Sequence, residues 1–342
     1  MRISRRTTFL ILIGILAAPA TLGAKQIKPV YQTGHQIRAE LGLSGGSGWM
    51  LVDLASGDVI DASNGDVAFV PASVAKLPTA AYALDALGPD HRFETTVRAT
   101  GTVSNGRLDG DLVLRGGGDP ELDTDGLWSL VAGLAEQGVR SVAGRFIVDA
   151  SALPQLSEIE STQGVDASYN PSISGLNLNF NRVHLKWDAR KGKREIAMVA
   201  ASQQRSPEVS GVRTVIDADP TAPLFALSVS EGRETWRMAA RAFRGQASRW
   251  LPVKNPASYA AEVFGLLARD RGIRLPAPTD NLAEVSLRQA GPASAEPPIA
   301  RHESRKLGTI LRDMLRFSTN VTAEVTGSAA TRSIGISAVD LR

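Results

Sequence analysis

The chain of 342 residues contains no cysteine, which excludes disulfide bridges and thiolate-bound metal sites. It has only four histidines, and their spacing matches no metal-ligand pattern. Neither sign of charge dominates, because 38 basic residues stand against 35 acidic ones. The formal net charge of +3 therefore argues against a nucleic-acid scaffold. With 43% hydrophobic and 21% charged residues the composition is that of a globular protein, and the length suits two or three domains.

The N-terminal apolar run, residues 9–20, is too short to span a membrane comfortably. A basic segment at 1–6 precedes it, and small residues at 18–20 and 22–24 offer cleavage points. The pattern is typical of an export signal over residues 1–24, and an ordinary signal is favoured over a twin-arginine one. We therefore expect a periplasmic protein that keeps no stable membrane span after cleavage.

Ser73 and Lys76 form the chain's single Ser-x-x-Lys motif, at the expected start of a helix. Positions three apart on a helix share one face, so the Lys76 amine can reach the Ser73 hydroxyl. A neutral amine there is a general base, which requires desolvation or a neighbouring positive charge to remove its proton. The alternative for such a motif is an N-cap serine followed by a surface lysine.

The surroundings of this motif predict a hairpin followed by a helix. Residues 49–54 are apolar enough for a buried strand, and residues 59–62 return after a turn. The helix that follows is expected to end at Gly88-Pro89. Pro78 lies inside this helix and predicts a kink or a tight first turn just after Lys76.

A second polar group, Ser318-Thr319-Asn320, follows an apolar pattern of helical spacing over residues 307–315. Ser318 and Asn320 are therefore expected at a corner where one helix ends and another begins at Val321. Taken alone, Ser318 or Asn320 could simply cap the second helix. A hydroxyl and a carboxamide on a rigid corner can also pass a proton to a leaving amine and hold a substrate amide.

The segment Pro71-Ala72-Ser73-Val74-Ala75-Lys76-Leu77 and the later Ser-Thr-Asn resemble the first two signature motifs of penicillin-binding serine D,D-peptidases. Their separation of 245 residues resembles the D-alanyl-D-alanine carboxypeptidase/endopeptidase family S13, which carries a large insertion between these motifs. The stretch 106–114 and the following Gly116-Gly117-Gly118-Asp119-Pro120 are similar to the start of that insertion. No phosphate-binding fingerprint follows the three glycines, so a turn is favoured there. The resemblance covers most of the chain after residue 40.

This resemblance implies a serine enzyme that cleaves D-Ala-terminated peptidoglycan peptides or their cross-links through an acyl-enzyme. In that scheme Ser73 attacks the carbonyl and Lys76 takes the proton, Ser318 relays it to the leaving group, and Asn320 holds the substrate backbone and Lys76. The implied partners are peptidoglycan stem peptides and β-lactams, with no nucleic acid and no cofactor. Neither the oligomeric state nor the balance of carboxypeptidase and endopeptidase activity follows from the sequence.

The family's third motif, Lys-Thr-Gly or His-Thr-Gly, is not found in these 342 residues. In the family it should follow Ser-x-Asn by roughly a hundred residues, so the sequence is expected to be a fragment. Two rival interpretations stay open. One is a catalytically degenerate module that binds wall peptides or penicillin, and the other is a relative of β-lactamases or esterases.

The predicted fold class is α+β, with a split penicillin-binding/β-lactamase-like catalytic domain that encloses a nested two-domain insertion, one αβ and one β-rich. The expected organisation is a signal peptide (1–24), a first catalytic segment (25–90), a first αβ segment (91–175), a β-rich domain (176–253), a second αβ segment (254–290) and an incomplete second catalytic segment (291–342).

Overall fold

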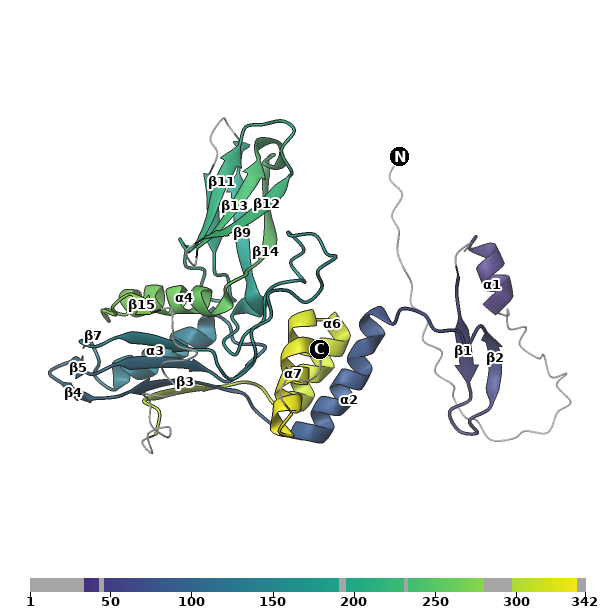
Figure 1. Ribbon diagram of the computed structural model, residues 1–342, viewed down its shortest axis with the longest axis horizontal. Coiled ribbons are helices and arrows are strands. Elements are labelled where there is room, and N and C mark those ends of the chain that lie inside the picture. The colour runs from purple at the N-terminus through teal and green to yellow at the C-terminus, as the bar shows by residue number, and fades with distance from the viewer. Residues whose placement is uncertain (1–33, 43–45, 191–194, 231–232, 280–296, 337–342) are drawn as a thin grey trace, which may run out of the picture. The chain divides into compact units, whose positions relative to one another are not determined.

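The computed structural model describes residues 34–42, 46–190, 195–230, 233–279 and 297–336, so the predicted signal segment lies outside the described residues. The chain divides into two compact units, Met1–Val70 and Pro71–Arg342. Each unit is described by itself below (Figure 1).

A β-hairpin and one short helix make up the described part of the first unit: β1 (Trp49–Val52), β2 (Val59–Ser63) and α1 (Gly34–Glu40). The two strands pair antiparallel, so the predicted hairpin is confirmed. The expectation that its first strand is buried is wrong, because Met50 and Leu51 are exposed. A two-stranded hairpin has too few neighbours to bury both of its faces.

Three helices of the second unit pack side by side: α2 (Lys76–Leu87), α6 (Leu307–Phe317) and α7 (Asn320–Ser333) (Figure 1). The predicted end of α2 is confirmed, since its C-cap is Gly88 with a positive φ of 81° that suits glycine. The helices share a small apolar core. Its buried side chains are Ala80, Ala83, Phe93, Leu307, Ile310, Leu311, Met314, Ala323 and Ala330.

A five-stranded mixed sheet adjoins this helical part, in the order β15-β8-β6-β3-β16. The edge strand β16 and its neighbour β3 are antiparallel, as are β3 and β6, whereas β8 runs parallel to β6 and β15. The strands are β3 (Glu94–Ala99), β6 (Leu112–Gly116), β8 (Phe146–Asp149), β15 (Pro278–Thr279) and β16 (Ala300–Glu303).

Two amphipathic helices, α3 (Thr124–Glu136) and α4 (Pro256–Asp270), contact each other and the strands of this sheet. The sequence explains where both helices begin, because each has a favourable N-cap residue. The side chains of Asp123 and Asn255 accept hydrogen bonds from backbone N–H groups in the first turns of α3 and α4. Leu127, Leu130, Leu134 and Phe264 lie among the fully buried side chains. A three-stranded sheet flanks this layer, in the order β4-β5-β7. Its strands are β4 (Thr102–Ser104), β5 (Arg107–Asp109) and β7 (Ser141–Val142).

The chain between β8 and α4 forms two further three-stranded sheets, ordered β10-β9-β14 and β11-β13-β12. Trp236 is completely buried in their shared core with Val183, Leu185 and Leu251. The short turns η2 (Asn179–Asn181) and η4 (Ala240–Ala242) adjoin them. The strands are β9 (Arg182–Asp188), β10 (Glu195–Val199), β11 (Val212–Asp217), β12 (Phe225–Ser230), β13 (Arg233–Ala239) and β14 (Gln246–Pro252).

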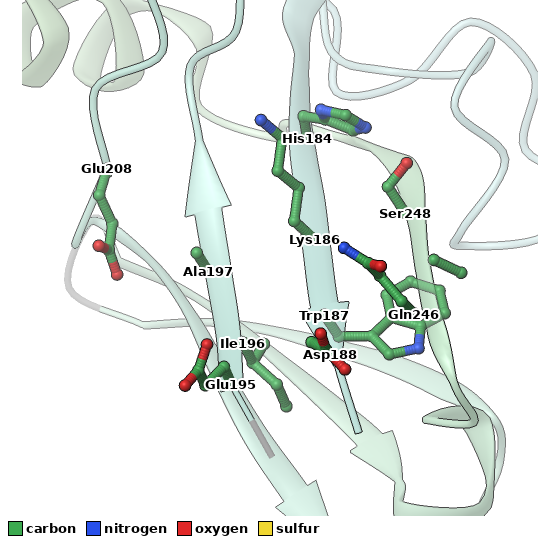
Figure 2. Close-up of a pocket in the computed structure, with 11 residues that line it drawn as sticks. His184, Lys186, Trp187, Asp188, Glu195, Ile196, Ala197, Glu208, Gln246 and Ser248 are labelled. Atoms are coloured by element: carbon green, nitrogen blue, oxygen red, sulfur yellow. The ribbon is translucent and has the colours of Figure 1, made fainter. Parts of the chain in front are cut away.

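One face of the β10-β9-β14 sheet forms an open hollow of about 610 Å³ (Figure 2). His184 and Lys186 reach it from β9, Ser248 reaches it from β14, and Glu208 stands at its side. Seven of its eleven lining residues carry polar or charged side chains, as expected for a solvated sheet face. None of the four predicted site residues lines it.

The mixture of helices and sheets confirms the predicted α+β class, whereas the predicted domain boundaries stay predictions. Within the described ranges, no helix is both long and apolar enough to cross a membrane. The same residues hold no cluster of three or more His, Asp or Glu side chains able to bind a metal ion.

Asp119, in the loop after β6, is a buried carboxyl group that lacks a full set of partners. Its Oδ1 accepts the backbone N–H of Glu121 at 2.9 Å, but Oδ2 has no hydrogen-bond partner in the described structure. The nearest basic group is His302, whose Nε2 lies 3.8 Å from Oδ2. Burial raises the pKa of Asp119 to about 7, and the hydrogen bond from Glu121 opposes this shift.

The substitution Asp119→Asn is expected to stabilise the protein at neutral and alkaline pH. Between pH 3.8 and about 7 the folded state binds a proton that the unfolded state has lost, so wild-type stability falls as the pH rises. The amide carries no charge and avoids this loss, which amounts to roughly 1.4 kcal/mol per pH unit within that window. Urea unfolding at pH 4, 5.5, 7 and 8 measures the difference between the two proteins.

The exposed Asp85 on α2 provides the matched control, since Asp85→Asn removes a solvated carboxylate. A stability difference between wild type and Asp119→Asn that does not change with pH would contradict the buried, partly neutral carboxyl group.

Candidate active site

Ser73 and Lys76 are brought together by a tight helical turn. Ser73 lies in the 3₁₀ turn η1 (Ala72–Ala75), and Lys76 is the first residue of α2. Side chains three apart are eclipsed in a 3₁₀ turn, and Lys76 Nζ donates to Ser73 Oγ at 3.4 Å. Lys76 is only 9% exposed, whereas Ser73 is open to solvent. The pair therefore combines an accessible hydroxyl with a desolvated amine.

The tight turn predicted from Pro78 is present, but it precedes Lys76 rather than following it. Pro78 is the third residue of α2, in the first turn, where a missing N–H costs little. The chain tightens instead at Ala72, which has a positive φ of 45°. A non-glycine residue pays of order 1–2 kcal/mol for the left-handed region, so strain is stored directly beside Ser73.

Ser318 lies at the corner between α6 and α7, as the sequence predicted. It is the C-cap of α6 in a left-handed conformation with φ 57° and ψ 41°. Its Oγ donates a hydrogen bond to Ser73 Oγ at 2.6 Å, across 245 residues of sequence. Ser73 Oγ thus stands between the Lys76 amine and the Ser318 hydroxyl, an arrangement in which a proton can leave Ser73 and pass onward.

Asn320 is the first residue of α7, close to this group. Its Nδ2 donates to the backbone carbonyl of Tyr169 at 3.0 Å. The expected contact with Lys76 is absent from the hydrogen bonds of the described residues, because the Lys76 amine is turned toward Ser73. The carboxamide instead connects α7 to the segment after β8.

The two capping alternatives are wrong for this structure. η1 and α2 have Pro71 and Ala75 as N-caps, neither with a side-chain hydrogen bond, so Ser73 is no capping serine. The N-cap of α7 is Thr319, and its hydroxyl bonds to Thr322 Oγ1 rather than to a backbone N–H.

A loop of the chain between the two motifs, residues 150–177, packs against α7 and contacts Asn320. Leu153 and Ile173 from this loop form a buried cluster with Val321 and Val325 of α7. At the far end of the helix, Arg332 donates to the carbonyl oxygens of residues 151 and 152. The loop is therefore attached along much of the length of α7.

Sequence reasoning missed two residues of this neighbourhood, Tyr169 and Glu324. Tyr169 comes from a loop whose docking on α7 no local pattern reveals. Glu324 is half-buried one helical turn after Asn320, and its spacing of four residues was the available signal. Burial raises the pKa of the Glu324 carboxyl, while the positive charge of Lys76 opposes this shift.

A family model and two related proteins that match this chain are all D-alanyl-D-alanine carboxypeptidases. The model of the D-Ala-D-Ala carboxypeptidase 3 (S13) family matches residues 39–338. The D-alanyl-D-alanine carboxypeptidase DacB of Haemophilus influenzae is 28% identical over 283 residues, which are 81% of this chain and 57% of that protein. A D-alanyl-D-alanine carboxypeptidase of an Actinomadura species is 41% identical over 103 residues, 30% of this chain and 19% of that protein.

The fold is similar to solved structures of penicillin-binding protein 4 from Haemophilus influenzae. One has a TM-score of 0.64 at 24% identity and covers 83% of this chain and 62% of the other. A second, complexed with a β-lactam, has a TM-score of 0.60 at 23% identity and covers 83% and 61% of the two chains. The predicted penicillin-binding fold is thereby confirmed, and the chain spans about three fifths of the length of these relatives.

The substitution Val325→Ala is expected to weaken the attachment of the loop to α7. Val325 is completely buried, so the lost methyl groups leave a cavity that lowers the free energy of unfolding by about 1–3 kcal/mol. Chemical denaturation measures this change. Val229→Ala, at a site that is 54% exposed, deletes the same atoms and should change stability by less than about 0.5 kcal/mol. Equal losses in the two variants would refute the packing role.

Proposed function

Because the chain belongs to the D-Ala-D-Ala carboxypeptidase 3 (S13) family, we propose that it carries the nucleophile of a serine D,D-carboxypeptidase. The substrate is a peptidoglycan stem peptide that ends in D-Ala-D-Ala. The observation that carries this proposal is the position of Ser73 Oγ, 3.4 Å from the Lys76 amine and 2.6 Å from the Ser318 hydroxyl.

In the first step Ser73 Oγ attacks the carbonyl carbon of the penultimate D-alanine, and its proton moves to the Lys76 amine. The Lys76 side chain is buried and its Nζ lies 3.4 Å from Ser73 Oγ, so the amine is placed to accept this proton. The backbone N–H of Ser73 faces the developing oxyanion and donates one of the hydrogen bonds that stabilise it.

In the second step the carbon–nitrogen bond breaks, and the leaving amine of D-alanine receives a proton through Ser318. Water, giving up a proton to the Lys76 amine, then attacks the ester carbonyl on Ser73. The bond to Ser73 Oγ breaks, the shortened peptide leaves with a carboxyl end, and the proton from water passes to Ser73 Oγ. When the leaving amine belongs to a neighbouring stem peptide, the same steps cleave a cross-link. In this scheme the Asn320 carboxamide, whose Nδ2 donates to the Tyr169 carbonyl, holds the substrate backbone through its remaining donor and acceptor.

A β-lactam is the natural probe of this proposal, and a related penicillin-binding protein 4 has been solved with one. We expect a β-lactam to acylate Ser73 and to persist, because the opened ring stays attached and blocks the approach of water. Ser73→Ala should abolish both this labelling and the release of D-alanine from a D-Ala-D-Ala peptide. Mass spectrometry of the digested protein locates the adduct, and a D-alanine assay follows the reaction.

The control is Ser129→Ala, which removes an exposed hydroxyl on α3 and should leave labelling unchanged. An adduct on any other residue would overturn the assignment of the nucleophile. Rapid hydrolysis of nitrocefin would instead favour a β-lactamase, and binding of the probe without covalent labelling or turnover would favour a degenerate binding module.

We also propose that the protein acts in the periplasm, where its substrate lies. The basic segment, the short apolar run and the small residues near position 24 support a cleaved export signal. The mature chain is expected to begin between Thr21 and Lys25. N-terminal sequencing of the exported protein checks this, and a mature protein that starts at Met1 would contradict it.

A further inference from the structure

Lys76 lacks a direct counter-charge. Within the described part of the chain its amine makes one hydrogen bond, to Ser73, and no ion pair. Its side chain is nevertheless buried. A flexible four-carbon side chain loses rotamer freedom when it is held in one place, and an ammonium is costly to bury without an opposite charge. The residue that compensates for this cost must face Lys76 from a neighbouring element.

The contacts between α2 and α7 fix which residues face one another. A Cβ atom built on Gly327 of α7 would lie 3.5 Å from the side chain of Thr79 on α2. One turn further along, the Tyr82 hydroxyl donates to Thr331 Oγ1 at 3.2 Å. Residue numbers rise along both helices from the first contact to the second, and the offset between partners changes by only one residue. The two helices therefore run parallel in nearly the same register (Figure 1).

One turn back along this register, Lys76 on α2 is level with Glu324 on α7. Lys76 and Glu324 each lie three residues before the Thr79–Gly327 contact, on the same helical faces. Glu324 is half-buried and makes no hydrogen bond or ion pair within the described residues. Lys76 is the charged group whose attraction acts on its carboxyl. The two side chains thus interact electrostatically without direct contact.

We propose that Glu324 is a positioning residue for Lys76. Its carboxylate faces the lysine ammonium across the contact between α2 and α7 and so holds the amine beside the Ser73 hydroxyl. This role rests on the proposed function, in which Lys76 is the base. Asn320 lies one turn before Glu324 on the same helix, and in the proposed function it holds the substrate backbone.

The test compares Glu324→Gln, which keeps the shape and removes the charge, with Glu324→Asp, which keeps the charge. Without the carboxylate the ammonium loses stabilisation, so the acid limb of the pH profile of kcat/KM should move to lower pH by about one unit. The aspartate variant should retain the wild-type limb, though with a lower kcat because its shorter side chain holds Lys76 less well. Glu136→Gln, at an exposed position on α3, is the matched control.

A second measurement does not depend on turnover. The rate at which an amine-selective reagent labels Lys76, followed by mass spectrometry from pH 6 to 11, reports when the amine loses its proton. Its midpoint should shift downward in Glu324→Gln and remain in Glu136→Gln. Thermal unfolding verifies that both variants are folded.

The two hypotheses fail in different ways. If Ser73→Ala keeps its activity, the proposed function is wrong, whereas the labelling midpoint still tests Glu324. If Glu324→Gln loses activity while both its pH profile and its labelling midpoint match the wild type, the residue is only structural and the inference is overturned.

Discussion

The site depends on the close packing of α2 against α6 and α7, because its side chains come from these helices and from the η1 turn that leads into α2. Small residues line this contact: Ala80 and Ala83 on α2 meet Ala323 and Ala330 on α7 in one buried cluster. Small side chains let helix axes approach closely. The 2.6 Å hydrogen bond between Ser318 and Ser73 is the local result, since longer side chains along the contact would move the two hydroxyls apart.

The chain between the two motifs takes part in this arrangement. In loop 150–177, Leu153 and Ile173 are buried against α7. The Tyr169 carbonyl of the same loop accepts a hydrogen bond from Asn320. A loop that were attached only through the sheets would leave that carboxamide free to rotate. A loop of the chain that separates the two motifs in sequence therefore orients one residue of the second motif.

The sequence was most informative where the chemistry is local. Spacing and end signals predicted α2, α6 and the corner at Ser318, because periodicity and a glycine stop act over a few residues. The family resemblance predicted which hydroxyls meet. The sequence did not predict the hydrogen-bond partner of Asn320 or the exposure of Met50. Each depends on which distant parts of the chain pack against that residue. The spacing of four residues between Asn320 and Glu324 can be read from the sequence. That Glu324 lies level with Lys76 can be inferred only from the register between α2 and α7.

The junction between the sheet and the helices determines how firmly Ser318 is held, because β16 leads into α6. Arg305 at this junction pairs with Glu121 and Asp313, yet it is half exposed, and such ion pairs contribute at most about 1 kcal/mol each. The buried hydrogen bond from the Phe93 N–H to Ser304 Oγ, 2.9 Å long, is protected from water, and breaking it would leave an unsatisfied group. Directed hydrogen bonding, rather than surface charge, therefore fixes the start of α6 and with it the corner that carries Ser318.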